Sequence, residues 1–191
     1  MIRRLRILSL LVLIVASECI CAQIRYLSSD VVDIIYCDSL RVATWAGWNL
    51  QADDCRKGQS RSSFKFQPDA RCGANPPTSI DYLLSGYDRG HLCPAADRSA
   101  SRARMKATFL LSNVVPQSPS LNRGDWKRYE DAARRYATNG HRLHIEVDCL
   151  WFNADTSYIG IHRLAVPHAF FKRVWDATSD SLIWSKFFYN Y

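Results

Sequence analysis

The sequence predicts a single α+β domain. Three features lead to this prediction: segments rich in β-branched and aromatic residues at 31–36, 42–50 and 144–149, one amphipathic helix pattern at 120–137, and a length of 191 residues. A chain of this length usually builds one hydrophobic core, and strands grouped on both sides of a helix indicate an α+β arrangement. No internal repeat or low-complexity block interrupts the pattern.

Residues 1–22 have the order of a secretory signal peptide. Three arginines precede an apolar run from Ile7 to Ala16, and small residues such as Ser17 and Ala22 follow it. The run is shorter than the roughly 20 apolar residues of a membrane-spanning helix. We therefore expect cleavage after Ala22, a domain of residues 23–191 without stable membrane association, and a secreted or periplasmic location. An arginine-rich start that serves mitochondrial import is the alternative.

The chain is basic, with a formal net charge of +7. The predicted cleavage removes three arginines and one glutamate, which lowers this charge to about +5. A basic domain attracts polyanions and gains affinity by releasing their counterions, so nucleic acid is the favoured partner. A solvated positive surface with no partner is the alternative.

Five cysteines remain after the predicted cleavage: Cys37, Cys55, Cys72, Cys93 and Cys149. An odd set in an oxidising compartment can form two disulfides with one thiol left over. Cys55 and Cys72 flank one polar loop and are the first pair to test. Cys93 is the candidate for the free thiol.

The first predicted elements of the domain are strands. Segments 31–36 and 42–50 form a strand pair around Asp38 and Ser39. The polar stretch 51–63 is a loop, and 64–66 is a short strand. Two prolines within 75–79 then break regular structure.

A long irregular hairpin is expected next. The segment Tyr87 to Pro94 is extended, and residues 108–115 form a strand that ends at Pro116. The charged connection between them should be solvated, with a rim facing phosphate as the functional alternative. Its basic residues are Arg98, Arg102, Arg104 and Lys106.

The helix at 120–137 ends at Asn139 and Gly140. At about 100° per residue its inward face includes Trp126, Tyr129, Ala133, Tyr136 and Ala137. On the same count Asn122 lies with this apolar face. Its polar amide is therefore aimed into the protein and needs a partner.

The C-terminal part is predicted to be strand. Residues 144–149 alternate in polarity, and 163–174 form an apolar extended run around Pro167. His144, Glu146 and Asp148 share one strand face; a metal site is conceivable there, but a solvated polar face is favoured. The aromatic tail is expected to pack against the core or a sheet edge rather than stack on bases.

The segment Tyr87-Asp88-Arg89-Gly90-His91-Leu92-Cys93-Pro94 and the later Asn122 carry the residue types that phosphodiester hydrolysis requires. A neutral histidine such as His91 can accept a proton from water, and Arg89 can pair with a phosphate oxygen. Asn122 offers an oxygen to a hard cation that keeps several waters. Gly90 allows close approach of backbone and substrate.

Each of these residues also has a structural alternative. His91 could be a core histidine, Asn122 a helix N-cap, and Arg89 a surface partner of Asp88. The remaining histidines, at 141, 144, 162 and 168, are interpreted as structural. The order of the candidates, separated by a strand and then a helix, favours the catalytic interpretation over the structural one.

The chain resembles the DNA/RNA non-specific endonuclease family over roughly residues 36–172. The motifs that carry the resemblance are Asp88-Arg89-Gly90-His91, Thr108-Phe109, Ser112-Asn113, Pro116-Gln117, Asn122, Trp126 and Glu130. The resemblance implies a ββα-metal (His-Me finger) core on a mainly antiparallel sheet scaffold. It also implies that His91 is the general base, Asn122 the Mg²⁺ ligand, Arg89 a phosphate contact, and Glu130 a group that orders metal-bound waters.

The sequence departs from the family pattern at Val147-Asp148-Cys149-Leu150, at Cys93, and in a short C-terminal portion. We expect an exported, Mg²⁺-dependent endonuclease that cuts DNA and RNA with little sequence preference, with Mn²⁺ as a possible substitute metal. The alternatives are a catalytically impaired nucleic-acid-binding protein on the same scaffold and a structural exported domain. The sequence does not fix the oligomeric state.

Overall fold

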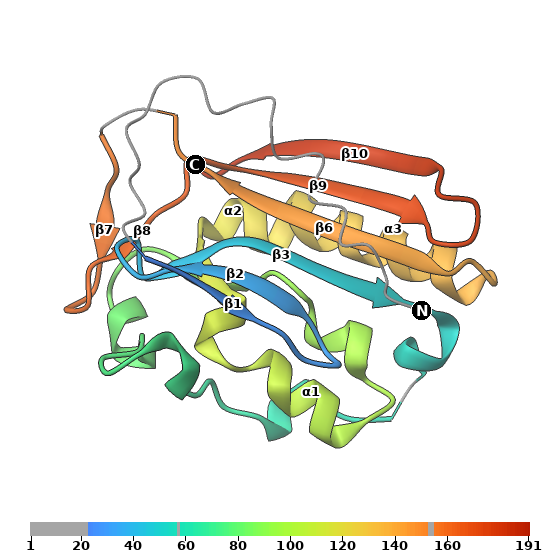
Figure 1. The fold of residues 1–191 in the computed structure, drawn as a ribbon, viewed down its shortest axis with the longest axis horizontal. Coiled ribbons are helices and arrows are strands. Elements are labelled where there is room, and N and C mark those ends of the chain that lie inside the picture. The colour runs from blue at the N-terminus through green and yellow to red at the C-terminus, as the bar shows by residue number, and fades with distance from the viewer. Residues whose placement is uncertain (1–22, 57, 153–154) are drawn as a thin grey trace.

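The computed structural model describes residues 23–56, 58–152 and 155–191. The predicted signal peptide lies outside these residues. A six-stranded antiparallel sheet forms the centre of the fold, in the order β1-β2-β3-β6-β9-β10 (Figure 1). Its strands are β1 (Ile24–Leu27), β2 (Asp33–Cys37), β3 (Val42–Leu50), β6 (Leu143–Leu150), β9 (Ala169–Asp176) and β10 (Leu182–Tyr189).

The described residues also form two short antiparallel pairs, three α-helices and six short 3₁₀ helices, the last at Ala52–Cys55, Arg61–Ser63, Ala70–Cys72, Ser79–Tyr82, Ala95–Arg98 and Leu111–Asn113. The pairs are β4 (Asp88–His91) with β5 (Val114–Gln117) and β7 (Tyr158–Ile159) with β8 (Leu164–Ala165). The helices are α1 (Arg102–Thr108), α2 (Pro119–Leu121) and α3 (Lys127–Thr138), and a turn of π-helix over Asn122–Trp126 joins the last two. The sheet and helices confirm the predicted α+β class.

The central strands follow their polarity patterns. β2 and β3 form the predicted hairpin, and β6 buries Leu143, Ile145 and Val147 while His144 and Glu146 point to its other face. α3 packs its Ala133 and Ala137 in the same hydrophobic cluster as the buried residues of β6, and it lies behind the sheet in Figure 1. The aromatic tail packs as expected at Phe188, which is buried against Trp126 and Tyr129.

The prediction of a strand over 108–115 is wrong for most of its length. Thr108 ends α1, a 3₁₀ turn covers Leu111–Asn113, and only β5 is extended. The cause is the buried side chain of Asn113, whose Nδ2 donates to the carbonyls of Cys93 and Thr108 while its Oδ1 accepts from the Cys93 N–H. These bonds occupy backbone groups that a continuous strand would pair.

The expected strand at 64–66 is also absent. A 3₁₀ turn covers Arg61–Ser63, and a single parallel bridge joins Gln67 to Leu110. Phe64 and Phe66 instead pack their rings against Phe109, at centroid distances of 5.6 and 5.1 Å. The apolar residues that suggested a strand are therefore used in side-chain packing.

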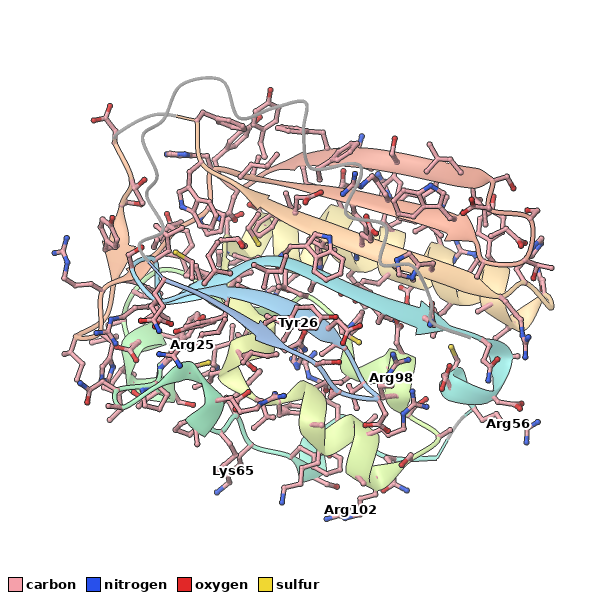
Figure 2. All side chains as sticks on the ribbon, in the orientation of Figure 1. Arg25, Tyr26, Arg56, Lys65, Arg98 and Arg102 are labelled. Atoms are coloured by element: carbon pink, nitrogen blue, oxygen red, sulfur yellow. The ribbon has the colours of Figure 1, made fainter. Side chains whose placement is uncertain are left out.

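Arg98 is buried, contrary to the prediction of a solvated loop. Its guanidinium donates to the carbonyl oxygens of Val31, Asp97 and Asn49, and Figure 2 shows it inside the fold, whereas Arg102 points outward. Carbonyl acceptors satisfy the donors of this buried cation. Arg98 thus links its own turn to two other segments, the residues before β2 and the C-terminal end of β3.

The helix predicted at 120–137 is interrupted by a kink at Gly124. The φ and ψ angles of this residue are −101° and −110°, which are not helical. A uniform 100° count therefore fails across it: Trp126 is buried as predicted, but Asn122 is only part-buried and Tyr136 is 39% exposed. The helix ends at Asn139 and Gly140 as expected.

Cys55, Cys72, Cys93 and Cys149 are free thiols. The two disulfides expected among the five cysteines are therefore not formed, the Cys55–Cys72 pair included, whereas the expectation of a free Cys93 is confirmed. Burial raises the pKa of Cys55, Cys72 and Cys93 to about 12. Cys72, Cys93 and Cys149 are buried and Cys55 is part-buried, and thiols with so high a pKa carry little reactive thiolate at neutral pH. No described helix has the length and apolar character to cross a membrane.

Candidate active site

The site is built on the antiparallel pair of β4 and β5. In its register Asp88 lies opposite Gln117, Arg89 opposite Pro116, and His91 opposite Val114. Because successive side chains of a strand point to opposite faces, Arg89 and His91 share one face of β4, and Asp88 and Gly90 share the other. The motif therefore divides its functional groups between two sides of one short strand.

His91 lies in an aromatic pocket and is 6% exposed. Its ring is 5.1 Å from that of Phe66 and 5.0 Å from that of Phe109, and its Nε2 atom is buried without a hydrogen-bond partner. Burial, together with the charge of Arg61, lowers the pKa of His91 to about 3. The imidazole is therefore neutral near pH 7, and in this buried state it is a weak base.

Arg89 is exposed and lies over the same aromatic ring as His91. Its guanidinium carbon is 5.1 Å from the centroid of Phe66, and it forms no ion pair with a described carboxylate. The suggested surface pair between Arg89 and Asp88 is therefore not formed. Phe66 therefore contacts both the candidate base and the candidate phosphate-binding residue. The N–H groups of the Arg89 guanidinium remain available to bind an anion.

Gly90 is required by a neighbouring side chain rather than by a substrate. A Cβ atom at this position would lie 2.2 Å from Oε1 and 2.4 Å from Cδ of Gln117. Gln117 is fully buried, and both polar atoms of its amide lack hydrogen-bond partners. The bare face of Gly90 is thus covered by Gln117, so the expectation that it admits substrate is wrong.

Asn122 is tied to the opposite face of β4. Its Nδ2 donates to Oδ2 of Asp88 at 2.9 Å, and the side chain of Arg123 donates to both oxygens of the same carboxylate at 2.7 and 2.8 Å. The hydrogen bond from Arg123 and the one from Asn122 lower the pKa of Asp88. Asn122 is therefore not an N-cap; Ser118 caps this segment through the Leu121 N–H.

The bond to Asp88 also fixes which way the Asn122 amide faces. An ionised carboxylate only accepts hydrogen bonds, so the NH₂ group must face Asp88 and Oδ1 must face away. No donor among the described residues reaches this oxygen.

The described chain also contains no cluster of three histidine, cysteine, aspartate or glutamate side chains suited to a metal. An amide oxygen with retained waters fits a hard cation such as Mg²⁺.

Glu130 lies on α3 in a group of buried and part-buried charges. Burial raises its pKa, while the positive charge of Lys172 on β9 opposes that change. Lys172 is buried, with Nζ 3.9 Å from the ring centroid of Trp126, and burial lowers its pKa. Nearby, Asp97 accepts hydrogen bonds from Arg134 at 2.7 Å and from the indole of Trp48 at 3.0 Å.

The structure thus brings the candidates together to different degrees. Arg89 and His91 meet at Phe66, and Asn122 is joined to the same strand through Asp88. No hydrogen bond or ion pair links Glu130 to Asn122 or His91 within the described chain. The sequence interpretation missed three contributors: Phe66, Gln117 and Lys172. Only Gln117 stood in a recognised motif, and nothing in the sequence pattern singled out the other two.

The rival metal face on β6 is occupied by ion pairs. His144 contacts Oε1 of Glu146 at 3.2 Å, and Arg173 contacts Glu146 at 3.1 Å and Asp148 at 2.6 Å. A guanidinium between two carboxylates supplies the positive charge that a metal would otherwise bring. The side chains of Glu146 and Asp148 are only 15% and 19% exposed, so this face is a partly buried ion-pair network and not the solvated face that was expected.

A hairpin that presents a neutral histidine and an arginine, followed by a helix that presents an amide oxygen, defines the class of ββα-metal nuclease folds. The model of the DNA/RNA non-specific endonuclease family matches residues 22–187. The chain belongs to the DNA/RNA non-specific endonuclease family. The matched residues include β4, β5 and the kinked helix.

Individual relatives agree with this assignment. Mitochondrial endonuclease G of Bos taurus is 35% identical over 161 residues, which cover 79% of this chain and 53% of the relative. Nuclease C1 of Cunninghamella echinulata var. echinulata is 38% identical over 154 residues, covering 74% of this chain and 61% of the relative. The chain spans about half the length of the curated relatives it matches.

A solved structure shows the same fold. A chain in the crystal structure of the EndoG/EndoGI complex, which describes a mechanism of EndoG inhibition, superposes with a TM-score of 0.77. The superposition covers 88% of this chain and 74% of that chain, at 27% identity. The antiparallel sheet with its β4, β5 and helix unit is therefore the scaffold shared with that nuclease.

Proposed function

We propose that this protein is a metal-dependent endonuclease that hydrolyses phosphodiester bonds of DNA and RNA with little sequence preference. The observation that carries the proposal is the placement of a neutral, aromatic-packed His91 and an unpaired Arg89 on one face of β4. Membership of the family supports the nuclease assignment, and the charge of +7 supports a polyanionic substrate.

His91 is proposed as the general base. In its neutral form it accepts the proton of the attacking water, and the aromatic rings of Phe66 and Phe109 hold the imidazole in one orientation. A phosphate bound next to it brings negative charge, which opposes the effect of Arg61 and raises the pKa of His91 toward the working pH. The substrate would thus strengthen the base that attacks it.

Arg89 is proposed to bind the scissile phosphate directly, and Asn122 is proposed to act on it through a metal ion. Arg89 donates to a phosphate oxygen, because no described carboxylate neutralises its guanidinium. Asn122 is the proposed metal ligand through Oδ1, with Asp88 holding the amide in place. A divalent cation held there, Mg²⁺ or in substitution Mn²⁺, would stabilise charge on the leaving oxygen. Glu130 is proposed to orient water around that site from α3.

The catalytically impaired binding protein remains the competing function, because Val147-Asp148-Cys149-Leu150 departs from the family. In the structure Val147 is buried in β6, and Asp148 is paired with Arg173 on the opposite face of that strand. This departure therefore alters a central strand and leaves the β4 residues unchanged. That placement favours an active enzyme over an inactive one.

The proposed function is tested by nicking of supercoiled plasmid and by digestion of mixed-sequence RNA, each with and without Mg²⁺. We expect both substrates to be cut only with the metal, with fragment ends spread over many sequences and with binding weakened steeply by salt. His141→Ala is the matched control for His91→Ala, because His141 is exposed and pairs with Asp176. Metal-independent cutting, refusal of one nucleic acid, or one dominant cleavage sequence would contradict the proposal.

Export is proposed from the order of residues 3–22, with mitochondrial import as the alternative. The relatives named as mitochondrial endonuclease G make the second location a real competitor. Edman sequencing of the protein recovered from culture medium and from cell fractions distinguishes them. We expect a secreted or periplasmic chain that begins near Gln23.

A further inference from the structure

A cavity of about 520 Å³ lies at the end of the fold that carries β7 and β8 (Figure 1), and none of its lining residues belongs to β4 or β5. Its lining comes from the β2–β3 turn, from Asn75, and from the β7–β8 hairpin. The two turns are joined by a hydrogen bond of 2.9 Å from the Ala165 N–H to the carbonyl of Leu40. This bond fixes the two hairpins relative to each other, and the cavity lies between them.

The lining is positively charged. Arg41 and Arg163 contribute guanidinium groups, His162 contributes an imidazole, and no carboxylate belongs to the lining described. Arg41 uses Nη1 to donate to the carbonyl of Asn75 at 2.8 Å, and Arg163 lies over the ring of Tyr158 at 4.5 Å. Neither arginine forms an ion pair with a described carboxylate, so both remain able to bind an anion.

Both arginines occupy an unfavourable backbone conformation. Arg41 has a φ of 55° and Arg163 a φ of 54°, in the left-handed region that favours glycine. Each of the two turns thus has an arginine at a position where glycine would adopt the same backbone conformation at a lower free-energy cost. Strain of this kind, retained twice around one cavity, is characteristic of functional sites.

The imidazole of His162 is held in a fixed orientation. Its Nδ1 lies 2.9 Å from Oδ2 of the buried Asp81, and its backbone N–H donates to Oδ1 at 3.0 Å. Burial opposes ionisation of Asp81, but these bonds and those from Thr78 lower its pKa below the ordinary value. Gly160 is needed for this contact, since a Cβ there would lie 2.4 Å from Asp81. With Nδ1 engaged, Nε2 is the ring nitrogen left for a ligand.

We propose that this cavity binds a nucleotide through its phosphate group, with Arg41 and Arg163 as the phosphate donors. The volume is in the range of small-molecule sites, about 300–1,000 Å³, and is larger than one phosphate requires. Tyr158 and Ile161, which is 77% exposed, supply an apolar surface against which a base can lie. The occupant is a free mononucleotide or the phosphorylated end of an oligonucleotide, and both present the same chemistry.

Binding is measured by isothermal titration calorimetry in EDTA, where no metal-dependent cleavage takes place. The probes are 5′-AMP, adenosine, and one short oligonucleotide with and without a 5′-phosphate. Tighter binding of 5′-AMP than of adenosine identifies a free nucleotide as occupant; a preference confined to the phosphorylated oligonucleotide identifies a chain end. Equal binding with and without phosphate, or no binding, overturns the proposal. Because the assay needs no catalysis, it remains interpretable if the nuclease proposal fails.

Glycine substitutions separate binding from folding. Arg41→Gly and Arg163→Gly remove the guanidinium and relieve the left-handed strain, so we expect melting temperatures within about 3 °C of the parent chain and affinity for the phosphorylated probe lowered about tenfold or more. Leu84→Gly is the backbone control, since Leu84 also has a φ of 55° but lies outside the cavity. Arg56→Gln is the charge control, at the opposite end of the fold from β7 (Figure 2). Unchanged affinity in both arginine variants overturns the assigned contacts.

Discussion

Asn122 donates a hydrogen bond of 2.9 Å from Nδ2 to Oδ2 of Asp88, which joins the kinked helix to the first residue of β4. The same carboxylate is held by Arg123, so one aspartate positions the amide and is itself fixed by a cation. The arrangement makes Asp88 a positioning residue for the proposed metal ligand.

The first prediction concerns this positioning. Asp88→Ala removes the acceptor that orients the Asn122 amide, so we expect the Mg²⁺ concentration for half-maximal nicking to rise roughly 10–100-fold. A Mg²⁺ titration of the plasmid-nicking rate measures it. Arg123→Gln is the matched control, because it removes the ion pair and leaves the bond between Asn122 and Asp88. An unchanged metal midpoint in Asp88→Ala would exclude the positioning role.

The second prediction concerns the proposed base. His91→Ala should reduce nicking by roughly 10²–10⁴-fold while DNA binding measured without metal stays close to that of the parent chain. Because the variant also leaves a space between Phe66 and Phe109, a thermal melt must accompany the assay. Parent-like nicking by the folded variant would show that another group takes the proton.

The third prediction follows from the pKa of His91, which is about 3 in the folded chain and about 6.5 when unfolded. Between these values the unfolded chain binds more protons, so the free energy of unfolding falls as the pH drops below about 6.5. Relative to His91→Gln, which cannot titrate, the parent chain should lose about 3 kcal/mol between pH 7.5 and pH 4.5. Urea unfolding at the two pH values gives the difference. Parallel pH profiles for the two chains would mean that His91 titrates normally.

The fourth prediction separates two roles of Glu130. Glu130→Gln removes the negative charge that compensates the buried Lys172, and we expect a loss of stability on the order of 3 kcal/mol. Adding Lys172→Met removes the uncompensated cation and should restore most of that stability. Nicking should stay low in the double variant, since the proposed water-ordering carboxylate is still missing. Full recovery of nicking along with stability would assign Glu130 a structural role alone.

The fifth prediction concerns the thiols. Cys55, Cys72, Cys93 and Cys149 should resist iodoacetamide in the folded chain, because burial raises their pKa and removes the thiolate. In urea without reductant all four should be alkylated, as peptide mass mapping will show. A Cys55–Cys72 disulfide peptide in that digest would contradict the free-thiol assignment.

The strands and the motif were predictable because both depend on local sequence. β6 alternates residue by residue, so its buried face follows from period-two polarity. The segment from Asp88 to His91 carries its own chemistry, and its resemblance to the family indicated the fold. These features do not require knowledge of distant contacts.

Two of the failures come from contacts between distant parts of the chain, and the third comes from a local break in the helix. Asn113 bonds to Cys93 and Thr108 and thereby converts an apolar run into a turn and a short strand. Carbonyls from Val31 and Asn49 draw Arg98 into the interior. Gly124 breaks the helical period, so the face of Asn122 could not be counted from the residues that follow it.

The contact between Gly90 and Gln117 couples two positions that lie 27 residues apart in sequence. A methyl group at position 90 has no room while the glutamine is present, whereas a shortened side chain at 117 would open that space. Gly90→Ala and Gln117→Ala should therefore be strongly non-additive in a double-mutant cycle, with the pair tolerated better than Gly90→Ala alone. Within the family, the two positions should vary in concert: a larger residue at one is compatible with this hairpin only beside a smaller residue at the other.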